Sequence, residues 1–343
     1  MGLKFVSIII PCRNEVNFIE GVLNSISAQD YPKDSLEVIV ADGMSDDGTR
    51  EKLAELSSSH LNLKVIDNPQ RVTPNALNLA IEASKGEVIV RLDAHSNYPS
   101  NYISRLVTEL FRLDAENVGG VWVTTPGNSG TVASAIALAT SHPLGIGNAS
   151  YRLDNPVIKE ADTVPFGCFK RSIFDKIGFF DTDLIRNQDD EFNGRIIKNG
   201  GKIFLVPDVE IEYYARATLG TMMKMFYQYG LFKPLVNIKL GHPATLRQFA
   251  PPIFVLGLLC LPIALLSEWL FMIWSAVYAI YFLMSAFISL QVAWREKRRG
   301  LSPYLFLAFF LIHFSYGWGY LRGIFKFVLL KNKVRANQTN LSR

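Results

Sequence analysis

The fold class follows from the stretch Val6-Ser7-Ile8-Ile9-Ile10-Pro11-Cys12-Arg13-Asn14-Glu15 near the start of the chain. Its β-branched run ends at Pro11 and predicts a buried strand of a parallel sheet. Residues 14–28 carry apolar side chains at helical spacing and predict a helix that ends before Tyr31-Pro32. Further strands are expected at residues 36–41, 64–66 and 87–92, with helices at residues 47–56 and 74–83 between them. This alternation predicts a doubly wound α/β sheet with ligands at the carboxyl ends of its strands.

Three apolar stretches follow residue 240, at residues 253–266, 270–290 and 304–320. The chain is 49% hydrophobic, and a membrane span needs about 20 apolar residues, so we expect at least two spans. The first stretch is short and contains Pro262, which suits one arm of a hairpin that turns at Ser267-Glu268-Trp269.

The basic cluster Trp294-Arg295-Glu296-Lys297-Arg298-Arg299 is expected on the cytoplasmic side of the membrane. Lys326, Lys331, Lys333 and Arg335 follow the third stretch and prefer the same side. Either the third stretch crosses and its basic end faces outward, or residues His313 to Gly323 form a re-entrant or interfacial helix.

Composition argues against nucleic-acid binding, because the net charge is only +4 and no basic stripe with interleaved aromatics occurs in the first 240 residues. Cys12, Cys168 and Cys260 are far apart and lack CxxC spacing, so neither a disulfide framework nor a zinc site is expected. The N-terminus carries no apolar core with a cleavage site. We therefore expect the first domain to lie in the cytoplasm, which is a reducing compartment.

Acidic residues follow the predicted strands where ligands should bind. Asp93-Ala94-His95 comes after residues 87–92, and an Asp oxygen with a His nitrogen suits Mn²⁺, or Mg²⁺ with added water. Such an ion would neutralise a departing diphosphate. The alternative is that Asp93 caps the next helix and His95 lies on the surface.

Two further acidic groups complete the series. Asp42 closes the second strand beside the first loop, where a nucleotide could bind, although Asp46 and Asp47 in the same loop are typical turn residues. Asp189 and Asp190 open a helix, where the helix dipole favours acids. A carboxylate there can also act as the general base toward an acceptor hydroxyl, and spacing does not separate these two residues.

Together these motifs resemble glycosyltransferase family 2, which has the A-type fold. The resemblance rests on the first loop, on Asp42-Gly43-Met44-Ser45-Asp46-Asp47-Gly48-Thr49, on Leu92-Asp93-Ala94-His95 and on Gln188-Asp189-Asp190-Glu191-Phe192, over about residues 5–235. Within the family the chain looks most similar to the succinoglycan-biosynthesis type of bacterial membrane glucosyltransferase. The segment Phe166-Gly167-Cys168-Phe169-Lys170-Arg171 contributes to this narrower likeness.

The resemblance implies a Rossmann-like mixed sheet followed by a helical membrane domain. It places Pro11, Arg13, Glu15, Asp42, Arg71 and Asp93 at the nucleotide-sugar donor, Asp93 and His95 at the metal, and Asp189, with Asp190 and Glu191, at the catalytic base. Arg171, Gln228 and Lys233 are expected to contact the acceptor or a phosphate. The sequence departs from the family at Gln188, where the family has Glu, and it lacks the Gln-x-x-Arg-Trp motif of processive synthases.

The predicted reaction is a single inverting displacement from a nucleotide sugar, by default a UDP-sugar, to a polyprenyl-diphosphate-linked acceptor in glycan assembly. Transfer to polyprenyl phosphate is one alternative, and a non-catalytic membrane scaffold of a glycan export system is another. We expect a cytoplasmic catalytic domain at residues 1–215, an interfacial region at 216–250, two to three membrane helices at 251–330 and a basic tail at 331–343 of an inner-membrane protein. The Met and aromatic residues of the interfacial region can equally fill a core.

Overall fold

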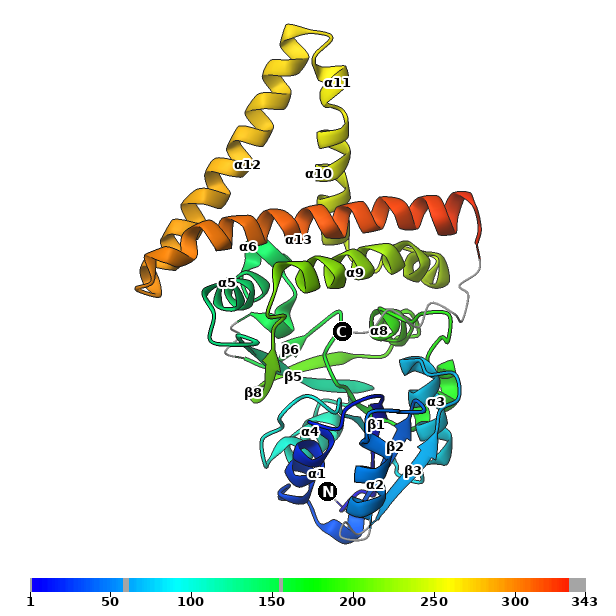
Figure 1. Ribbon diagram of the computed structural model, residues 1–343. Coiled ribbons are helices and arrows are strands. Elements are labelled where there is room, and N and C mark those ends of the chain that lie inside the picture. The colour runs from blue at the N-terminus through cyan, green and yellow to red at the C-terminus, as the bar shows by residue number, and fades with distance from the viewer. Residues whose placement is uncertain (1, 58–61, 154–156, 333–343) are drawn as a thin grey trace. The chain divides into compact units, whose positions relative to one another are not determined.

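The computed structural model describes residues 2–57, 62–153 and 157–332, and these divide into two compact units (Figure 1). The first unit comprises residues up to 123 together with 157–213. The second comprises residues 124–153 and 214–332. Residues 124–153 therefore group with the C-terminal helices, while the functional boundary expected at residue 215 stays a prediction. Lys333 and Arg335 of the expected basic tail lie outside the described residues.

The first unit is built on a mixed eight-stranded sheet in the order β3-β2-β1-β4-β7-β5-β8-β6. Its four N-terminal strands are parallel, and β7 pairs antiparallel with both β4 and β5. The strands are β1 Val6–Cys12, β2 Leu36–Asp42, β3 Leu63–Asp67, β4 Val88–Arg91, β5 Asn117–Thr125, β6 Lys159–Glu160, β7 Cys168–Lys170 and β8 Ile203–Tyr214. This mixed sheet confirms the predicted fold class.

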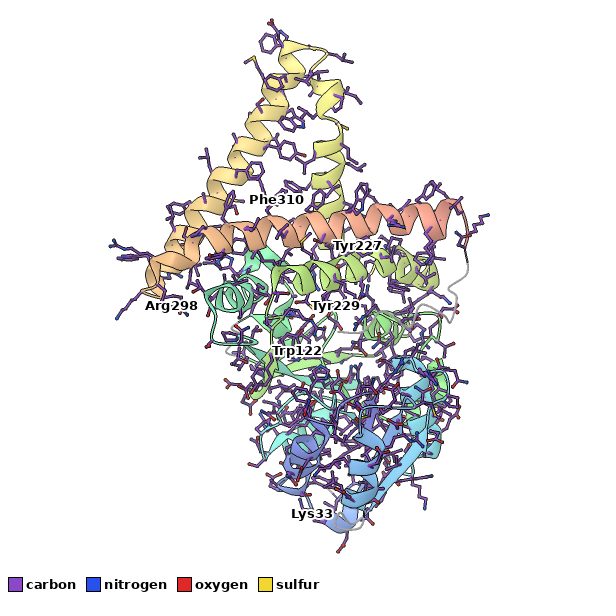
Figure 2. The ribbon with its side chains drawn as sticks, in the orientation of Figure 1. Lys33, Trp122, Tyr227, Tyr229, Arg298 and Phe310 are labelled. Carbon is purple, nitrogen blue, oxygen red and sulfur yellow. The ribbon has the colours of Figure 1, made fainter. Side chains whose placement is uncertain are left out.

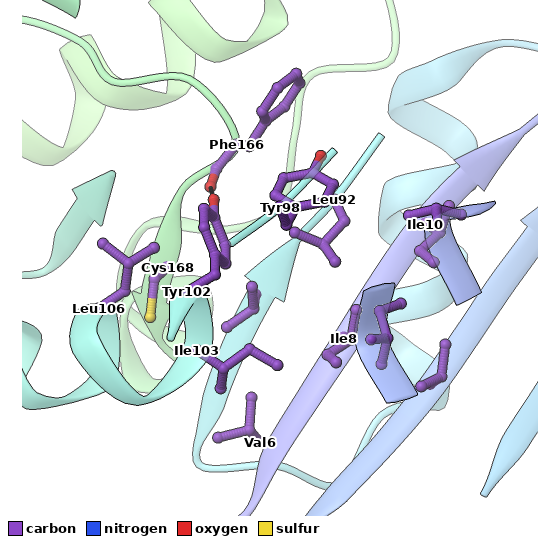
Figure 3. Close-up of a cluster of buried hydrophobic side chains, with 14 of the residues drawn as sticks. Val6, Ile8, Ile10, Leu92, Tyr98, Tyr102, Ile103, Leu106, Phe166 and Cys168 are labelled. Atoms are coloured by element: carbon purple, nitrogen blue, oxygen red, sulfur yellow. Dashed lines mark hydrogen bonds between the residues drawn. The ribbon is translucent and has the colours of Figure 1, made fainter. Parts of the chain in front are cut away.

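Helices cover both faces of the sheet because its central strands are buried on both faces. Val6, Ile8 and Ile10 of β1 share one core with Tyr102 and Ile103 of α4 (Figure 3), and α3 packs on β1 and β2. The helices of this unit are α1 Ile19–Ser27, α2 Thr49–Ser57, α3 Thr73–Ala83, α4 Tyr102–Arg112, α7 Ser172–Ile177 and α8 Gln188–Lys198.

Helix α1 begins later than the predicted residue 14. Asn14 has a left-handed backbone (φ 55°), and the amide of Phe18 bonds to the carbonyl oxygen of Glu15, so this stretch forms a turn. The side chain of Asn14 is held by the second loop rather than by a helix. The periodic apolar pattern was right for the helix but did not reveal this tertiary contact.

The second unit is helical, and two of its long helices, α9 Leu219–Leu240 and α13 Ser302–Gly323, run parallel to each other (Figure 1). Met222, Met225 and Phe226 of α9 are buried with Phe309 and Ile312 of α13. The Met and aromatic residues of α9 thus fill a core, as the alternative interpretation of residues 216–250 allowed. The remaining helices are α5 Thr131–Thr140, α6 Pro143–Ile146, α10 Ala250–Leu259, α11 Leu261–Ala264 and α12 Glu268–Arg295.

The first two apolar stretches form a helical hairpin. Trp274 Nε1 of α12 donates to the Gly257 carbonyl at 2.8 Å, and the Tyr278 hydroxyl donates to the Phe254 carbonyl at 2.7 Å. Two described helical segments are long and apolar enough to cross a membrane, Glu268–Arg295 and Arg299–Leu329. The share of the apolar window that is buried is 11% in the first and 44% in the second. The two segments therefore differ in how much apolar surface they leave exposed.

Candidate active site

The loops that follow β1, β2, β3 and β4 meet at one edge of the sheet. Cys12 pairs with Asp42, and Asp42 pairs with Asp67, so three strands end at the same level. Arg91 at the end of β4 pairs with Ile9 of β1. Parallel strands present their carboxyl ends together, which brings the predicted donor loops side by side.

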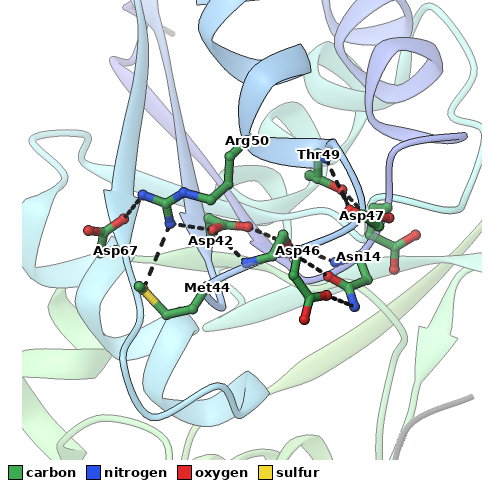
Figure 4. A network of polar contacts seen from close by, with 10 residues as sticks. Asn14, Asp42, Met44, Asp46, Asp47, Thr49, Arg50 and Asp67 are labelled. Atoms are coloured by element: carbon green, nitrogen blue, oxygen red, sulfur yellow. Dashed lines mark hydrogen bonds and ion pairs between the residues drawn. The ribbon is translucent and has the colours of Figure 1, made fainter.

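The first and second loops are joined by side-chain hydrogen bonds (Figure 4). The Asn14 side chain donates to Asp46 Oδ1 at 2.9 Å and accepts from the Asp46 amide at 3.1 Å. The Glu15 amide donates to Thr49 Oγ1 at 2.8 Å. Asp46 therefore ties the second loop to the first.

Asp42 is fully buried and its carboxylate is engaged by the protein. Oδ1 accepts from the Ser45 hydroxyl at 2.5 Å, while Oδ2 accepts from the Ser45 amide at 3.1 Å and from Arg50 at 2.8 Å. Arg50 also bonds to Asp67 at 2.9 Å. In this structure Asp42 shapes the second loop, and its predicted contact with the nucleotide base stays a prediction.

Two arginines of the predicted donor site lie together. Arg13 Nη1 donates to the backbone carbonyl of Arg71 at 3.3 Å, and Arg71 itself has a left-handed backbone (φ 60°). Pro11 precedes them at the end of β1 and is half-buried. This bond places the Arg13 guanidinium next to the backbone of Arg71, and a cation beside the strand ends suits an anionic ligand.

Asp93 and His95 flank a turn rather than an extended strand. The chain turns at Ala94 and His95, so strand geometry does not hold the two side chains on one face as the sequence suggested. The Asp93 amide donates to the Tyr98 hydroxyl at 2.8 Å, and His95 Nδ1 lies 3.4 Å from Glu15 Oε1. Helix α4 begins only at Tyr102, so Asp93 does not cap it.

A residue that the sequence interpretation missed lies at the centre of the cluster. Arg91, the last residue of β4, is buried and bonds through Nη2 to Asp93 Oδ1 at 3.1 Å and through Nη1 to Asp189 Oδ1. Although burial alone would lower the pKa of Arg91, these two carboxylates raise it above its usual value. The available signal was the arginine itself, because a charge inside an apolar strand requires a charged partner.

Asp189 lies in the first turn of α8, which follows the left-handed Asn187 (φ 62°). Burial raises the pKa of Asp189 above its usual range, and the Arg91 guanidinium opposes this shift. The Asp189 side chain still has 36% of its surface exposed, so a substrate hydroxyl can approach it. Asp190 is half-buried beside it, and the catalytic roles of both residues stay predictions.

Glu191 points into the protein and forms an ion pair with Arg195 of the next helical turn. Arg195 Nε lies 2.5 Å from Glu191 Oε1, and the same guanidinium bonds to the carbonyls of Ile177 and Phe179 at 2.6 Å. This geometry stabilises the start of α8 and favours Asp189 over Glu191 as the base. Gln188 is buried beside them and adds no charge.

The three predicted acceptor or phosphate contacts lie on different elements: Arg171 is in the first unit, and Gln228 and Lys233 are in the second. Arg171 follows β7 and lies next to the start of β4, whereas Asp93 follows the end of β4. The Arg171 guanidinium bonds to the Ser84 hydroxyl at 2.6 Å. The predicted contact of Arg171 with the acceptor or a phosphate stays a prediction. Gln228 and Lys233 lie buried on α9 of the second unit, and their predicted contacts stay predictions.

The cluster combines the half-buried carboxylate of Asp189, whose pKa is raised, with the carboxylate of Asp93 and the imidazole of His95. Such a set can remove a proton from a hydroxyl at Asp189, while the binding of a hard cation at Asp93 and His95 stays a prediction. In the described ranges 2–57, 62–153 and 157–332, no group of three or more His, Cys, Asp or Glu residues is placed to hold a metal ion. Two protein ligands suffice where substrate phosphates and water fill the other positions, as is usual for Mg²⁺.

Comparison with known proteins identifies the family of the chain. The sequence model described as "Glycosyl transferase family 2" matches residues 7–178. The succinoglycan biosynthesis protein ExoA of Rhizobium meliloti (strain 1021) is 29% identical over 324 residues, which cover 93% of this chain and 95% of that protein. A dolichyl N-acetyl-alpha-D-glucosaminyl phosphate 3-beta-D-2,3-diacetamido-2,3-dideoxy-beta-D-glucuronosyltransferase of Methanococcus voltae is 28% identical over 332 residues, covering 94% and 98%.

Solved structures show a similar fold. The mannosyltransferase PcManGT of Pyrobaculum calidifontis, determined with GDP-Man and Mn²⁺, has a TM-score of 0.59 and 19% identity over 93% of this chain and 88% of its own. TarS 1-349 of S. aureus, determined with UDP-GlcNAc, has a TM-score of 0.50 and 15% identity, covering 96% and 93%. At these identities the likeness concerns the fold.

Proposed function

The chain belongs to glycosyl transferase family 2 and is a hexosyltransferase, and from this premise we propose that it transfers a sugar from a nucleotide donor to a lipid-linked acceptor with inversion. The observation that carries the proposal is the placement of Asp189 and Asp93 on either side of the buried Arg91. A non-catalytic scaffold has no need of this arrangement, because a buried cation between two carboxylates gives little net stability.

The proposed reaction is a single displacement with Asp189 as general base. Asp189 accepts the proton of the acceptor hydroxyl while that oxygen forms a bond to the anomeric carbon of the donor. The bond from this carbon to the diphosphate oxygen breaks, and the nucleoside diphosphate leaves. Attack opposite the leaving group inverts the configuration. The raised pKa of Asp189 makes this carboxylate a stronger base than an exposed one.

The donor diphosphate is proposed to bind at the strand edge near Arg13 and Arg71, with Pro11 and Glu15 beside the nucleoside. Asp93 and His95 would hold Mn²⁺ or Mg²⁺. When bound, such an ion neutralises the charge that develops on the departing diphosphate. PcManGT is described with Mn²⁺ and GDP-Man, whereas TarS is described with UDP-GlcNAc. We propose a UDP-sugar, the donor expected from the family resemblance.

The acceptor is proposed to be a sugar on a polyprenyl diphosphate at the cytoplasmic face of the inner membrane. The name of the Methanococcus voltae relative describes a sugar carried on dolichyl phosphate as its acceptor, which favours a lipid-linked sugar over a soluble one. The apolar hairpin of α10–α12 gives the chain a means of staying at a membrane. Transfer directly to polyprenyl phosphate is the second candidate.

The proposal is tested by nucleoside diphosphate release from a panel of nucleotide sugars. The detergent-purified full chain is incubated with Mn²⁺ or Mg²⁺ and with or without bacterial lipid extract. Release should require lipid and should be lost in Asp189→Asn. Asp114→Asn, whose side chain is 91% exposed, makes the same chemical change elsewhere and should keep activity. Consumption of no donor under any condition would end the catalytic proposal.

A further inference from the structure

The two units of the chain carry opposite charge, which the small net charge of +4 conceals. Residues 124–153 and 214–332 contain thirteen Lys and Arg and only two acids, Glu268 and Glu296. Residues 1–123 and 154–213 contain 19 Lys and Arg and 29 Asp and Glu. A unit that is both apolar and strongly cationic is suited to an anionic lipid surface.

Seven of these thirteen cations lie near the two ends of α13. Arg295, Lys297, Arg298 and Arg299 precede its start, and Arg322, Lys326 and Lys331 follow at its end. Residues 303–321 between them carry no Lys, Arg, Asp or Glu. A helix that crossed the bilayer would carry one of these two basic clusters to the far side, against the positive-inside rule.

Packing ties the orientation of α13 to that of α9. A Cβ on Gly319 would lie 2.2 Å from the Tyr227 carbonyl oxygen, and one on Gly323 would lie 2.3 Å from that of Leu231. Glycine at these positions lets the two backbones touch, and they run side by side (Figure 1). The two helices must therefore take the same orientation to the membrane.

Helix α9 is not suited to the hydrocarbon layer. It contains Lys224, Lys233 and Lys239 and is not among the described segments that are long and apolar enough to span. Lysine at the centre of a span is strongly unfavourable. Since α9 has to stay at the surface, α13 has to stay there with it.

The hairpin of α10–α12 has the opposite character. From residue 248 to residue 294 the only charged side chain is Glu268, at the tip of the hairpin. Its apolar side chains project outward on several sides (Figure 2), and Leu266 and Trp269 beside the tip are 82% and 74% exposed. At 28 residues α12 is about 42 Å long, enough to cross a hydrocarbon layer of about 30 Å.

We propose that only the α10–α12 hairpin enters the bilayer, while α9 and α13 lie along its surface with the two basic ends of α13 bound to anionic phospholipid head groups. This inference rests on the membrane association in the proposed function and decides between the two orientations that the sequence leaves open for residues 304–320. Both ends of α13 are then on the cytoplasmic side. Glu268 and Trp269 reach the opposite interface.

The orientation is tested by cysteine labelling with a membrane-impermeant maleimide. Cys260→Ala removes the exposed cysteine and leaves Cys12 and Cys168, which are buried and serve as the unlabelled background. Into this background Ser267→Cys, Gly300→Cys and Asn332→Cys are introduced one at a time. Gly300→Cys and Asn332→Cys should both react in inverted vesicles, and Ser267→Cys should react only from the opposite face.

Labelling of Gly300→Cys and Asn332→Cys from opposite faces would show that α13 crosses and would overturn the proposal. Release of the chain from membranes by alkaline carbonate would instead refute the membrane association on which it rests. Neither readout depends on catalysis, so an inactive preparation gives the same answer.

The lipid preference is tested by the phospholipid retained during purification in mild detergent. Arg295, Lys297 and Arg299 are changed together to Gln, leaving Arg298, which bonds to Ser134 at 3.1 Å. The ratio of anionic to zwitterionic phospholipid should fall by about tenfold. The matched control changes Lys64, Lys85 and Lys202, which are exposed on the first unit, to Gln and should retain the wild-type ratio. Equal ratios in both triple variants would refute the headgroup contact.

Discussion

Replacement of Arg91 is the most informative perturbation of the site. Arg91→Met removes the guanidinium that holds Asp93 and Asp189 while keeping an unbranched side chain of similar length. Arg91→Lys keeps the charge but cannot reach both carboxylates, because an ammonium is a point charge rather than a planar fork. The pair of variants thus separates the charge of Arg91 from its geometry.

The expected loss of stability follows from the two bonds that disappear. A hydrogen bond to a charged group contributes about 1.5–3 kcal/mol. The Asp189 and Asp93 side chains are 36% and 20% exposed, so water replaces part of each lost bond and the lower end of the range applies. We expect Arg91→Met to reduce the free energy of unfolding by roughly 2–3 kcal/mol. In a unit of this size that corresponds to a fall in Tm of about 5–10 °C.

The pH profile of donor turnover reports on the base separately from stability. A general base acts only when deprotonated, so the rate falls as pH drops through its pKa. Burial raises the pKa of Asp189 and Arg91 opposes the rise, so removing Arg91 moves the acidic limb of the profile to higher pH. Arg91→Lys should show a smaller shift. We expect kcat to fall by about 100-fold in Arg91→Met through misplacement of the carboxylates.

The assay is initial-rate release of nucleoside diphosphate from pH 5 to 9, at a temperature below the Tm of each variant. An unchanged acidic limb in a folded Arg91→Met protein would refute the assignment of Asp189 as the base that Arg91 controls. Loss of activity at every pH with a wild-type Tm would also contradict the stability argument.

Three further predictions concern other residues. Glu191→Gln should destabilise the first unit by about 2–4 kcal/mol, because Arg195 loses a buried partner, but it should leave the acidic limb of the pH profile at the same pH. Thermal unfolding measures the first effect and the rate profile the second. A shift of the acidic limb would make Glu191 part of the base. Asp93→Asn and His95→Gln should each weaken Mn²⁺ binding by about tenfold or more. Electron paramagnetic resonance of free Mn²⁺ in the presence of nucleoside diphosphate measures this binding, and the control Asp114→Asn should bind Mn²⁺ as the wild type does. Gly319→Ala should lower the Tm in detergent by separating α9 from α13, since its Cβ would lie 2.2 Å from a carbonyl oxygen. The control Gly220→Ala adds a Cβ that meets nothing within 4 Å and should leave the Tm the same or slightly higher.

The sequence by itself determined the parts of the protein that depend on local pattern. The β-branched runs, the helical spacing after them and the acids at the strand ends predicted four parallel strands and the loops that carry the site, because periodicity and strand polarity are local properties. The hairpin around Ser267 was also predicted from apolar length and Pro262. The family resemblance rested on the same short motifs and is confirmed over residues 7–178.

Only the tertiary structure decided which side chains meet. The register between β1 and β4 placed Arg91 between Asp93 and Asp189, which are 96 residues apart in sequence, and no local pattern encodes that contact. The antiparallel pairing of β7 with β4 put Arg171 at the opposite end of β4 from Asp93. The packing of α13 along α9, on which the proposed surface orientation rests, also appears only in the tertiary structure, since hydropathy measures how apolar a helix is and not what it lies against.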